Sequence, residues 1–511
     1  MNVEHLDRGD AVSQILRYYW QGTRWVAKGS SKASNALARH ISEAITDRRE
    51  GRGARRGLLA PGDPPPPPDM IGSFYDYRGV LSLRRVPDDL RHGTFPLGRY
   101  VHPARGVLQP IGLPPAAADH NVGVIGPAGS GKTKSIIVPW AVAGLRAGYS
   151  VVTIDVKGDL LKEIKEEARA GAPLGVRAHS LDYTRPAASM HWNWLAELDD
   201  DRAIDRAVAA ILGHQPPPGT DPYFFNMDAS LLRGLLELVS GSPRRGSITA
   251  GRLLRLLKDQ NDLERTLARY PSSPAATRLR DLPSLDPADY AKRITGVAVR
   301  LDALAKPMVE AVTDRLDLSV GDILRERTLV SVVAPKQDGQ MAQMLSSLFV
   351  NQLLNRAYDR FTAPAGVPLL LVLDEAAQLA DRIDFENVLS VARAAGVALV
   401  IAVQDAQQFK DADQRSVIFA NCGTLVCMSG VSHASAELMA KRVGEHPVQI
   451  SSLSRSPAQH GPGHSTSRTM GTQMAPVLGV REIMSPPFGP WTATVHARDL
   501  ASNPFIVDLT R

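Results

Sequence analysis

Short apolar runs of strand length recur along the chain and alternate with stretches in which apolar residues recur every three or four positions. The runs at 122–125, 151–154, 369–373 and 397–403 are almost wholly apolar, which is typical of strands buried on both faces of a parallel sheet. The stretches between them have the periodicity of helices. This alternation predicts an α/β fold in which a mostly parallel sheet is built from strands joined by crossover helices.

A long stretch in the middle of the chain breaks this alternation. Residues 194–327 are rich in Leu, Ala and Arg at helical spacing and are interrupted by proline-rich turns such as HQPPPGTDP. We therefore expect an all-helical domain inserted into the α/β unit. The predicted organisation is an N-terminal helical segment (1–58), a proline-rich linker (59–70), the first part of the α/β domain (71–193), the helical insertion (194–327) and the second part of the α/β domain (328–511).

The two ends of the chain have patterns of their own. Apolar residues at helical spacing in 12–45 predict helices, and five successive prolines at 64–68 form a stiff spacer behind them. Arginines gather at 47–57, where a solvated helix end and a patch for nucleic acid or acidic lipid both fit. Residues 451–474 are rich in Ser, Gly, His and Pro, which predicts a mobile loop, and residues 490–500 predict a closing strand.

Length, charge and cysteine usage narrow the picture further. With 511 residues the chain is too long for one core, so two or three domains are expected. The net charge of +6 favours a polyanionic partner, although 46 arginines against 13 lysines also fit an arginine-rich coding bias. The two cysteines, Cys422 and Cys427, share one apolar segment and are expected to be buried thiols in a reducing cytoplasm, because a metal site needs more ligands.

The hydropathy of the chain also favours the cytoplasm. No apolar run approaches the roughly 20 residues of a membrane-spanning helix. The N-terminal sequence MNVEHLDRGD carries acidic residues and lacks the apolar core of a secretory signal. We therefore expect a cytoplasmic protein.

Residues 126–133, with the sequence GPAGSGKT, have the spacing of a phosphate-binding loop. The glycines allow positive φ angles and bring backbone N–H groups close to phosphate oxygens. Lys132 supplies a positive charge for the β and γ phosphates, Thr133 offers a hydroxyl to Mg²⁺, and the start of the following helix adds its dipole. A glycine-rich turn between strand and helix is the alternative. The predicted nucleotide-binding residues are Gly126, Pro127, Ala128, Gly129, Ser130, Gly131, Lys132 and Thr133.

The apolar strand at 369–373 ends in two carboxylates, Asp374 and Glu375. Because such a strand emerges at the carboxyl edge of a parallel sheet, we expect both side chains beside the phosphate loop if the two strands are neighbours. Asp374 would then hold Mg²⁺, directly or through water, and Glu375 would polarise the attacking water. An acidic helix start is the alternative. The adjacent pair favours a hydrolase over a phosphate-loop kinase.

Two further residues are candidates for sensing or completing the reaction. Gln404 follows the strand at 397–403, where an amide could detect the γ-phosphate and report its loss, although it could equally cap a helix. Arg393 precedes the same strand. It is either a surface arginine at a helix end or an arginine finger that reaches the nucleotide of an adjoining subunit.

Together these motifs resemble the TraG/TraD-type coupling proteins of type IV secretion and conjugation, over most of residues 75–511. The matching blocks are GPAGSGKTKS (126–135), VVTIDVKGDL (151–160), LLLVLDEAAQLA (369–380) and SVARAAGVALVIAVQDAQQF (390–409). The resemblance implies a RecA-like, FtsK-related P-loop NTPase core with an inserted all-helical domain, which assembles as a hexameric ring and uses ATP and Mg²⁺ to recruit and pump DNA or nucleoprotein. It also implies that Lys132 and Thr133 bind nucleotide and Mg²⁺, that Asp374 and Glu375 form the Walker B pair, that Gln404 is the sensor and that Arg393 is a finger acting across the ring.

The sequence departs from this family in two places. Val156 replaces the proline of the family's D-P-K-G-[DE] block, which we expect to be tolerated. Such proteins also usually begin with a membrane anchor, and this sequence shows none. Either a membrane-anchored channel component recruits the chain to the inner face of the cell membrane, with residues 1–58 as the docking segment, or the motor works on DNA in the cytoplasm. A helical cap packed on the motor is the alternative role for residues 1–58.

Three functions fit these features. The first is an ATP-driven DNA translocase that couples DNA, together with a relaxase or other secretion substrate proteins, to a transfer channel. The second is an FtsK-like cytoplasmic DNA pump, and the third is a docking module for relaxase or effector proteins that nucleotide switches without pumping. The helical insertion favours the first function over the second, and Glu375 favours a hydrolysing motor over a switch.

Overall fold

The computed structural model describes residues 87–102, 106–169, 174–217, 219–457, 464–486, 489–501 and 503–510. The predicted N-terminal helical segment (1–58) and proline-rich linker (59–70) lie outside the described residues.

The described chain is built around an eleven-stranded sheet with the order β2-β1-β13-β12-β9-β3-β8-β7-β4-β6-β5. In this spatial order, the strands from β9 through to β5 are parallel to one another. The four strands on the other side of β9 each pair antiparallel with their neighbours. The strands are β1 (Phe95–His102), β2 (Gly106–Leu113), β3 (Val122–Ile125), β4 (Ser150–Asp155), β5 (Arg177–Leu181), β6 (Thr328–Val333), β7 (Leu369–Asp374), β8 (Val397–Val403), β9 (Thr424–Met428), β12 (Thr492–Ala497) and β13 (Phe505–Asp508). The apolar runs of the sequence thus become the central parallel strands.

These strands are almost wholly apolar because both faces of the sheet are covered. Along β8 the odd-numbered residues, such as Leu399 and Ile401, join the hydrophobic cluster on one face, and the even-numbered residues, such as Ala398 and Val400, join the cluster on the other. The helices α5 (Val138–Arg146) and α6 (Leu160–Arg169) contribute to the second cluster. Burial on both faces removes the polar–apolar alternation seen in half-exposed strands.

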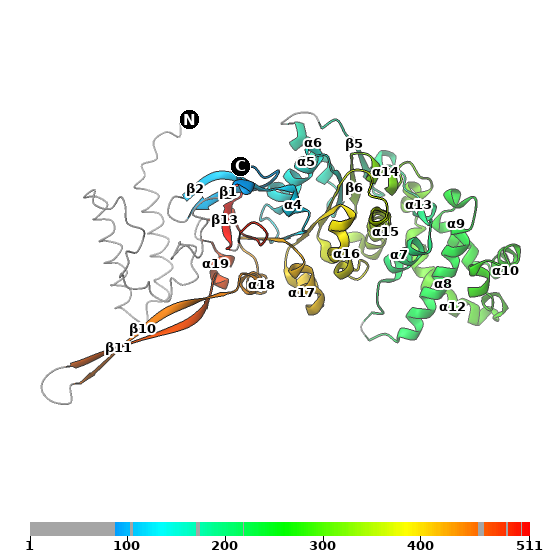
Figure 1. Ribbon diagram of the computed structural model, residues 1–511. Coiled ribbons are helices and arrows are strands. Elements are labelled where there is room, and N and C mark those ends of the chain that lie inside the picture. The colour runs from blue at the N-terminus through cyan, green and yellow to red at the C-terminus, as the bar shows by residue number, and fades with distance from the viewer. Residues whose placement is uncertain are drawn as a thin grey trace.

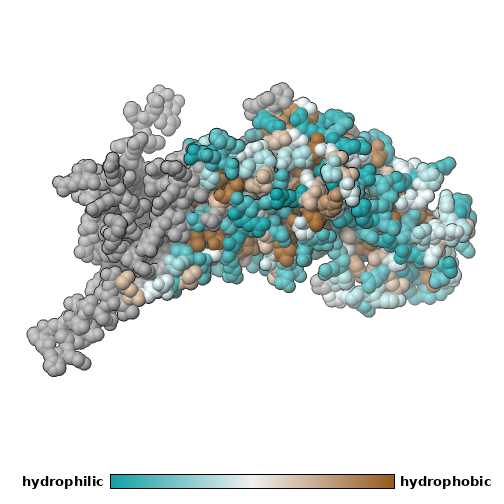
Figure 2. Space-filling model, viewed as in Figure 1, coloured by the Kyte–Doolittle hydropathy of each residue, from teal (hydrophilic) through white to brown (hydrophobic). Residues whose placement is uncertain are grey.

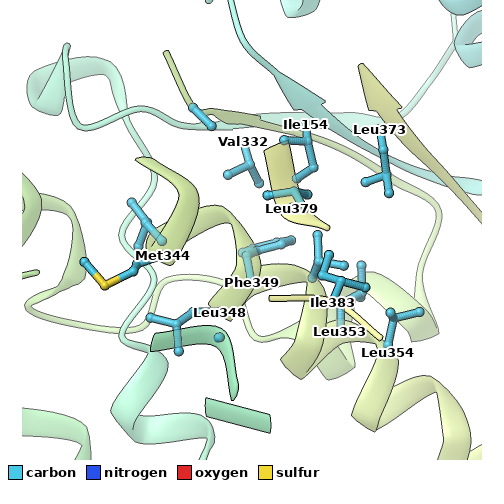
Figure 3. Close-up of a cluster of buried hydrophobic side chains, with 14 of the residues drawn as sticks. Ile154, Val332, Met344, Leu348, Phe349, Leu353, Leu354, Leu373, Leu379 and Ile383 are labelled. Atoms are coloured by element: carbon cyan, nitrogen blue, oxygen red, sulfur yellow. The ribbon is translucent and has the colours of Figure 1, made fainter. Parts of the chain in front are cut away.

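The first face is covered by α15 (Gly339–Tyr358), whose residues are buried almost all round the helix. Figure 3 shows Leu348, Phe349 and Leu353 of this helix in one buried cluster with side chains from β4, β6 and β7, including Ile154 and Leu373. The same hydrophobic cluster continues into the helices of the insertion. The sheet and the helical region therefore share a continuous core.

Helices fill the stretch between β5 and β6. They are α7 (Asp201–Leu212), α8 (Pro222–Ser240), α9 (Ala250–Lys258), α10 (Gln260–Arg269), α11 (Pro274–Arg278), α12 (Pro287–Leu304), α13 (Pro307–Thr313) and α14 (Val320–Arg325). Several begin with a side chain that accepts a backbone N–H, such as Asp200, Asp286 and Ser319, as expected of helix caps. In Figure 1, α8, α10 and α12 lie at the end of the molecule farthest from β1 and β2. The division of the chain into domains stays a prediction.

The predicted mobile loop at 451–474 is wrong. Strands β10 (Glu445–Pro457) and β11 (His464–Pro476) pair antiparallel over their whole length and form a hairpin that projects from the body beyond α18 (His433–Val443) (Figure 1). The strands escaped notice because they form a separate two-stranded sheet and their sequence is rich in Ser, Gly, His and Pro, as is typical of loops. The closing strand expected in 490–500 is β12.

The remaining sequence expectations concern thiols and hydropathy. Cys422 and Cys427 are buried and form no disulfide, and burial raises the pKa of each thiol to about 12.

Within the described part of the chain, no helix combines the length and the apolar character needed to cross a bilayer. On the face seen in Figure 2, hydrophobic residues lie scattered among hydrophilic ones.

Candidate nucleotide-binding site

The phosphate-binding loop joins β3 to a helix that begins with the π-helical turn Thr133–Ile137 and continues as α5. Gly129 and Gly131 have φ angles of 78° and 86°, a region that favours glycine. The N–H of Gly126 donates to the carbonyl of Val403 at a distance of 3.1 Å, which ties the start of the loop to the end of β8. The loop therefore lies at the carboxyl edge of the parallel strands, as the sequence predicted.

Lys132 meets Glu375 even though their strands are not neighbours. The condition stated from the sequence, that β3 and β7 are neighbouring strands, is not met, because β8 lies between them. Two strand spacings amount to roughly 10 Å, which two long side chains can bridge. Lys132 Nζ lies 3.3 Å from Glu375 Oε1, and both side chains are more than nine-tenths buried. A buried ammonium and carboxylate therefore lie beside the phosphate loop.

Asp374 ends β7 and is also buried. Its Oδ1 atom has no hydrogen-bond partner in the described chain, and burial raises its pKa to about 6, with a smaller opposing effect of the nearby Lys132. A buried carboxylate oxygen without a partner suits a cation. Among the described residues no three His, Cys, Asp or Glu side chains cluster to hold a metal alone. This fits Mg²⁺, which commonly uses one or two carboxylates together with substrate phosphates.

Glu375 has an unusual backbone conformation. Its φ and ψ angles of 66° and 50° lie in the left-handed region, which costs a residue with a side chain roughly 1–2 kcal/mol. Non-glycine residues in this conformation often occur at functional sites. The strained residue, Glu375, is the one that the sequence predicted to polarise the attacking water.

The amide that contacts Glu375 belongs to Gln408, which the sequence interpretation missed. Gln408 Nε2 donates to Glu375 Oε2 at 3.2 Å, and Gln408 Oε1 accepts the backbone N–H groups of Gln404 and Asp405 at 2.9 and 3.2 Å. Gln404, the predicted sensor, thus reaches Glu375 indirectly, through its backbone. The signal for Gln408 was the D-x-x-Q spacing of a capping box, formed here by Asp405 and Gln408.

Arg393 lies apart from this group. It is exposed in the turn Ala392–Ala395, which precedes β8, whereas the phosphate loop and the carboxylates follow the carboxyl ends of their strands. Because β8 has seven residues, its two ends are roughly 20 Å apart. The structure does not bring Arg393 to the loop of its own chain, and its role as a finger in an adjoining subunit stays a prediction.

Residues 107–487 match the model of the family described as type IV secretory system conjugative DNA transfer. The chain belongs to this family. The matched region contains the phosphate loop, both carboxylates, Gln408 and the helical insertion. The TraG/TraD-type resemblance stated from the sequence motifs is therefore confirmed.

Three curated relatives of this chain carry the name VirD4. The chain is 23% identical to the VirD4 protein of Agrobacterium fabrum over 349 residues, which cover 66% of this chain and 51% of that protein. It is 22% identical to VirD4 of Rhizobium radiobacter over 348 residues, 66% of this chain and 49% of that protein. The chain thus spans about half the length of the curated relatives it matches.

Solved structures of the conjugative coupling protein TrwB share the fold. The unbound form of TrwBdeltaN70 superposes with a TM-score of 0.60 at 18% identity, covering 85% of this chain and 93% of that one. TrwB in complex with ADP and Mg²⁺ gives a TM-score of 0.57 at 17% identity, covering 78% and 87%. The predicted RecA-like α/β fold with a mostly parallel sheet is therefore confirmed.

The DVKGD block, which corresponds to the family's D-P-K-G-[DE] block, forms a hydrogen-bonded turn. Asp155 accepts the backbone N–H groups of Lys157 and Gly158, each at 2.9 Å, and that of Leu160 at 2.8 Å. These bonds close the turn after β4 and begin α6. Val156 occupies the position of the family's proline within this turn, and its being tolerated there stays a prediction.

Proposed function

We propose that the chain is an ATP-hydrolysing coupling protein that recruits DNA or nucleoprotein and drives it into a type IV secretion channel. One observation carries the enzymatic part of this proposal: a buried contact between Lys132 and Glu375 lies beside a carboxylate, Asp374, that has an unpartnered oxygen. A switch that only binds nucleotide has no need of Glu375 beside the metal ligand.

Each residue of the site has its own proposed role in nucleotide binding or hydrolysis. Residues 126–133 cradle the phosphates through backbone N–H groups, and Lys132 neutralises their charge. Thr133 and Asp374 would hold Mg²⁺, which when bound withdraws charge from the β and γ phosphates. Glu375 accepts a proton from the attacking water. Gln408 holds the Glu375 carboxylate in position by donating to Oε2 while Lys132 contacts Oε1.

The choice of cofactor and partners draws support from the relatives. TrwB has been solved with ADP and Mg²⁺, with an ATP analogue and with a GTP analogue. The family match favours conjugative transfer over an FtsK-like pump. DNA would be bound mainly through its backbone phosphates, since a motor that passes any sequence cannot depend on base edges. A relaxase or secretion substrate, a membrane-anchored channel component and a hexameric ring complete the proposal.

The first prediction tests hydrolysis directly. The purified chain should hydrolyse ATP in the presence of Mg²⁺, and DNA should stimulate the rate. Lys132→Ala should weaken ATP binding. Glu375→Gln should retain ATP binding and lower kcat by roughly 100-fold or more, because it removes the general base and keeps the side-chain shape. Steady-state assays and titration calorimetry measure the two effects.

Glu386→Gln is the matched control, because Glu386 is exposed on α16 (Phe385–Val391) away from the loop, and it should leave both constants unchanged. Wild-type turnover by Glu375→Gln protein would falsify the assignment of Glu375. Tight ATP binding by wild-type protein without any hydrolysis would instead favour the docking module.

A further inference from the structure

The two flanks of the phosphate loop differ in chemistry. On one flank, across β8, lie the carboxylates Asp374 and Glu375, and the loop's own Lys132 reaches toward them, which marks the γ-phosphate end of a bound nucleotide. On the other flank lie β9 and then β12, which follow β3 in the sheet order. A nucleotide whose γ-phosphate points toward β7 extends its ribose and base away from the charged flank, toward β9 and β12.

Trp491 stands on that second flank, directly against the loop. A Cβ atom placed on Gly131 would lie 3.2 Å from Cζ3 and 3.6 Å from Cε3 of the indole. Trp491 is 49% exposed, whereas Trp140, Trp192 and Trp194 are buried. A large aromatic surface is therefore open to solvent immediately beside the loop.

The backbone holds this indole in a fixed place. The N–H of Leu509 donates to the carbonyl of Trp491 at 2.8 Å, and the next residue, Thr492, begins β12. The carbonyl of Thr492 in turn accepts the N–H of Ser429 at 2.9 Å, just after β9. Because the backbone of Trp491, in the turn immediately before β12, is hydrogen-bonded to the residue after β13, less backbone entropy is lost there when a ligand binds.

The surroundings on this flank are apolar. The Sδ atom of Met428 would lie 2.6 Å from a Cβ placed on Gly126, and Ser130 Oγ donates to the same sulfur at 3.1 Å. The ring of Pro127 approaches Gly430 in the same region. The Met428 side chain is fully buried beneath the loop, so the partly exposed Pro127 ring and the exposed Trp491 indole are the apolar groups that can offer a nucleobase dispersion contacts and a π-face.

We propose that Trp491 stacks on the base of the bound nucleotide and supplies base affinity without strong selection between purines. The inference rests on the proposed nucleotide site and adds to it the group that binds the base. Stacking uses the face of the base, which adenine and guanine both present, so ATP and GTP should gain similar affinity from the indole.

The test separates base affinity from phosphate affinity. Titration calorimetry with Mg²⁺ compares ATP, GTP and inorganic tripolyphosphate on wild-type protein and on Trp491→Ala, Trp491→Leu and Trp491→Phe. Trp491→Ala and Trp491→Leu should weaken ATP and GTP binding by roughly 10- to 100-fold and leave tripolyphosphate binding unchanged. Trp491→Phe should recover most of the loss. Tyr270→Ala is the matched control, because Tyr270 is 48% exposed in the helical region and should affect none of the ligands.

Three outcomes would overturn the inference. Unchanged ATP affinity in Trp491→Ala protein would remove the stacking role. An equal loss of ATP and tripolyphosphate affinity would show that the indole only shapes the loop. If wild-type protein binds tripolyphosphate as tightly as ATP, the phosphate loop binds phosphates but the nucleobase contributes no affinity. Wild-type protein that binds neither ligand would instead refute the proposed nucleotide site itself.

Discussion

At the scale of single residues, the site is held in arrangements that cost stability. Asp374 is a buried carboxyl group whose pKa is raised to about 6, so the folded state disfavours its charged form. Glu375 has a left-handed backbone conformation that its side chain makes unfavourable. Both costs fall on neighbouring residues at the end of β7. Conformational and electrostatic strain of this kind is expected where a structure is selected for chemistry rather than stability.

The charge of Asp374 gives a pH-dependent prediction. Its pKa rises from 3.8 to about 6 on folding, so between these values the unfolded chain ionises while the folded chain stays protonated, and stability falls as pH rises. Above pH 6 the full penalty, up to about 3 kcal/mol, is present. Asp374→Asn should therefore be more stable than wild type at pH 7–8 without nucleotide or Mg²⁺, and the difference should vanish near pH 4.

Urea denaturation across this pH range measures the effect. Asp302→Asn, at an exposed position on α12, is the control and should shift stability little at any pH. A destabilised Asp374→Asn protein at neutral pH would show that the carboxylate is stabilised in the fold after all.

At the scale of elements, the turn after β8 connects the strand end to the carboxylate. Gln408 accepts two backbone N–H groups at this end with its carbonyl oxygen and donates to Glu375 with its amide nitrogen. A displacement of the β8 end is therefore transmitted to Glu375 through one side chain. The backbone of Gly126 is hydrogen-bonded to Val403 at the same strand end. The phosphate loop and the general base Glu375 are therefore both connected to the end of β8.

This arrangement predicts a positioning role for Gln408. Gln408→Ala should lower kcat by about 10- to 100-fold while leaving the Kd for ATP nearly unchanged, because the residue orients Glu375 and does not contact the phosphate loop. Gln408→Glu should not restore activity, since a second carboxylate cannot donate to Glu375. ATPase assays and titration calorimetry give the two constants.

Gln407→Ala serves as the control, because Gln407 is the exposed neighbour in the same turn. If Gln404→Ala loses kcat and Gln408→Ala does not, the sensor predicted from the sequence is correct and the positioning role is not.

The sequence predicted elements well where burial dictated the pattern. The central strands were visible because both faces of the sheet are covered, so runs such as 397–403 are wholly apolar. The β10–β11 hairpin was not visible, because its sequence has the Ser, Gly, His and Pro content of a loop and it pairs in a separate two-stranded sheet. The order of strands also could not be deduced: nothing in the sequence places β8 between β3 and β7. Only the structure shows that Lys132 and Glu375 meet across it and that Gln408 joins them.

At the scale of the whole molecule, the described part of the chain has no arginine in a hydrogen bond or ion pair with Asp374 or Glu375. Arg393 is exposed at the opposite ends of the parallel strands. An exposed arginine at that edge can serve a nucleotide only if a second subunit is placed against it. The proposed ring supplies such a subunit.

The last prediction therefore concerns mixed assemblies. Arg393→Ala should lower kcat by roughly 1,000-fold or more with little change in ATP affinity, because the finger acts on the transition state of a neighbour. In mixtures with wild-type subunits, activity should fall faster than the mutant fraction rises. Arg252→Ala, an exposed arginine on α9, should lower activity in neither setting. Activity that falls only in proportion to the mutant fraction would rule out action between subunits.

The hairpin that projects beyond α18 has a mechanical consequence. Each of its strands has 13 residues, so the paired region reaches roughly 40 Å from its base. The base is tied at Gly444, whose carbonyl accepts the N–H of Val477, immediately beyond α18. A swing of about 10° at that fulcrum would carry the far end of the paired strands through roughly 7 Å, more than one strand spacing. The length of the hairpin would therefore amplify any rotation at its base.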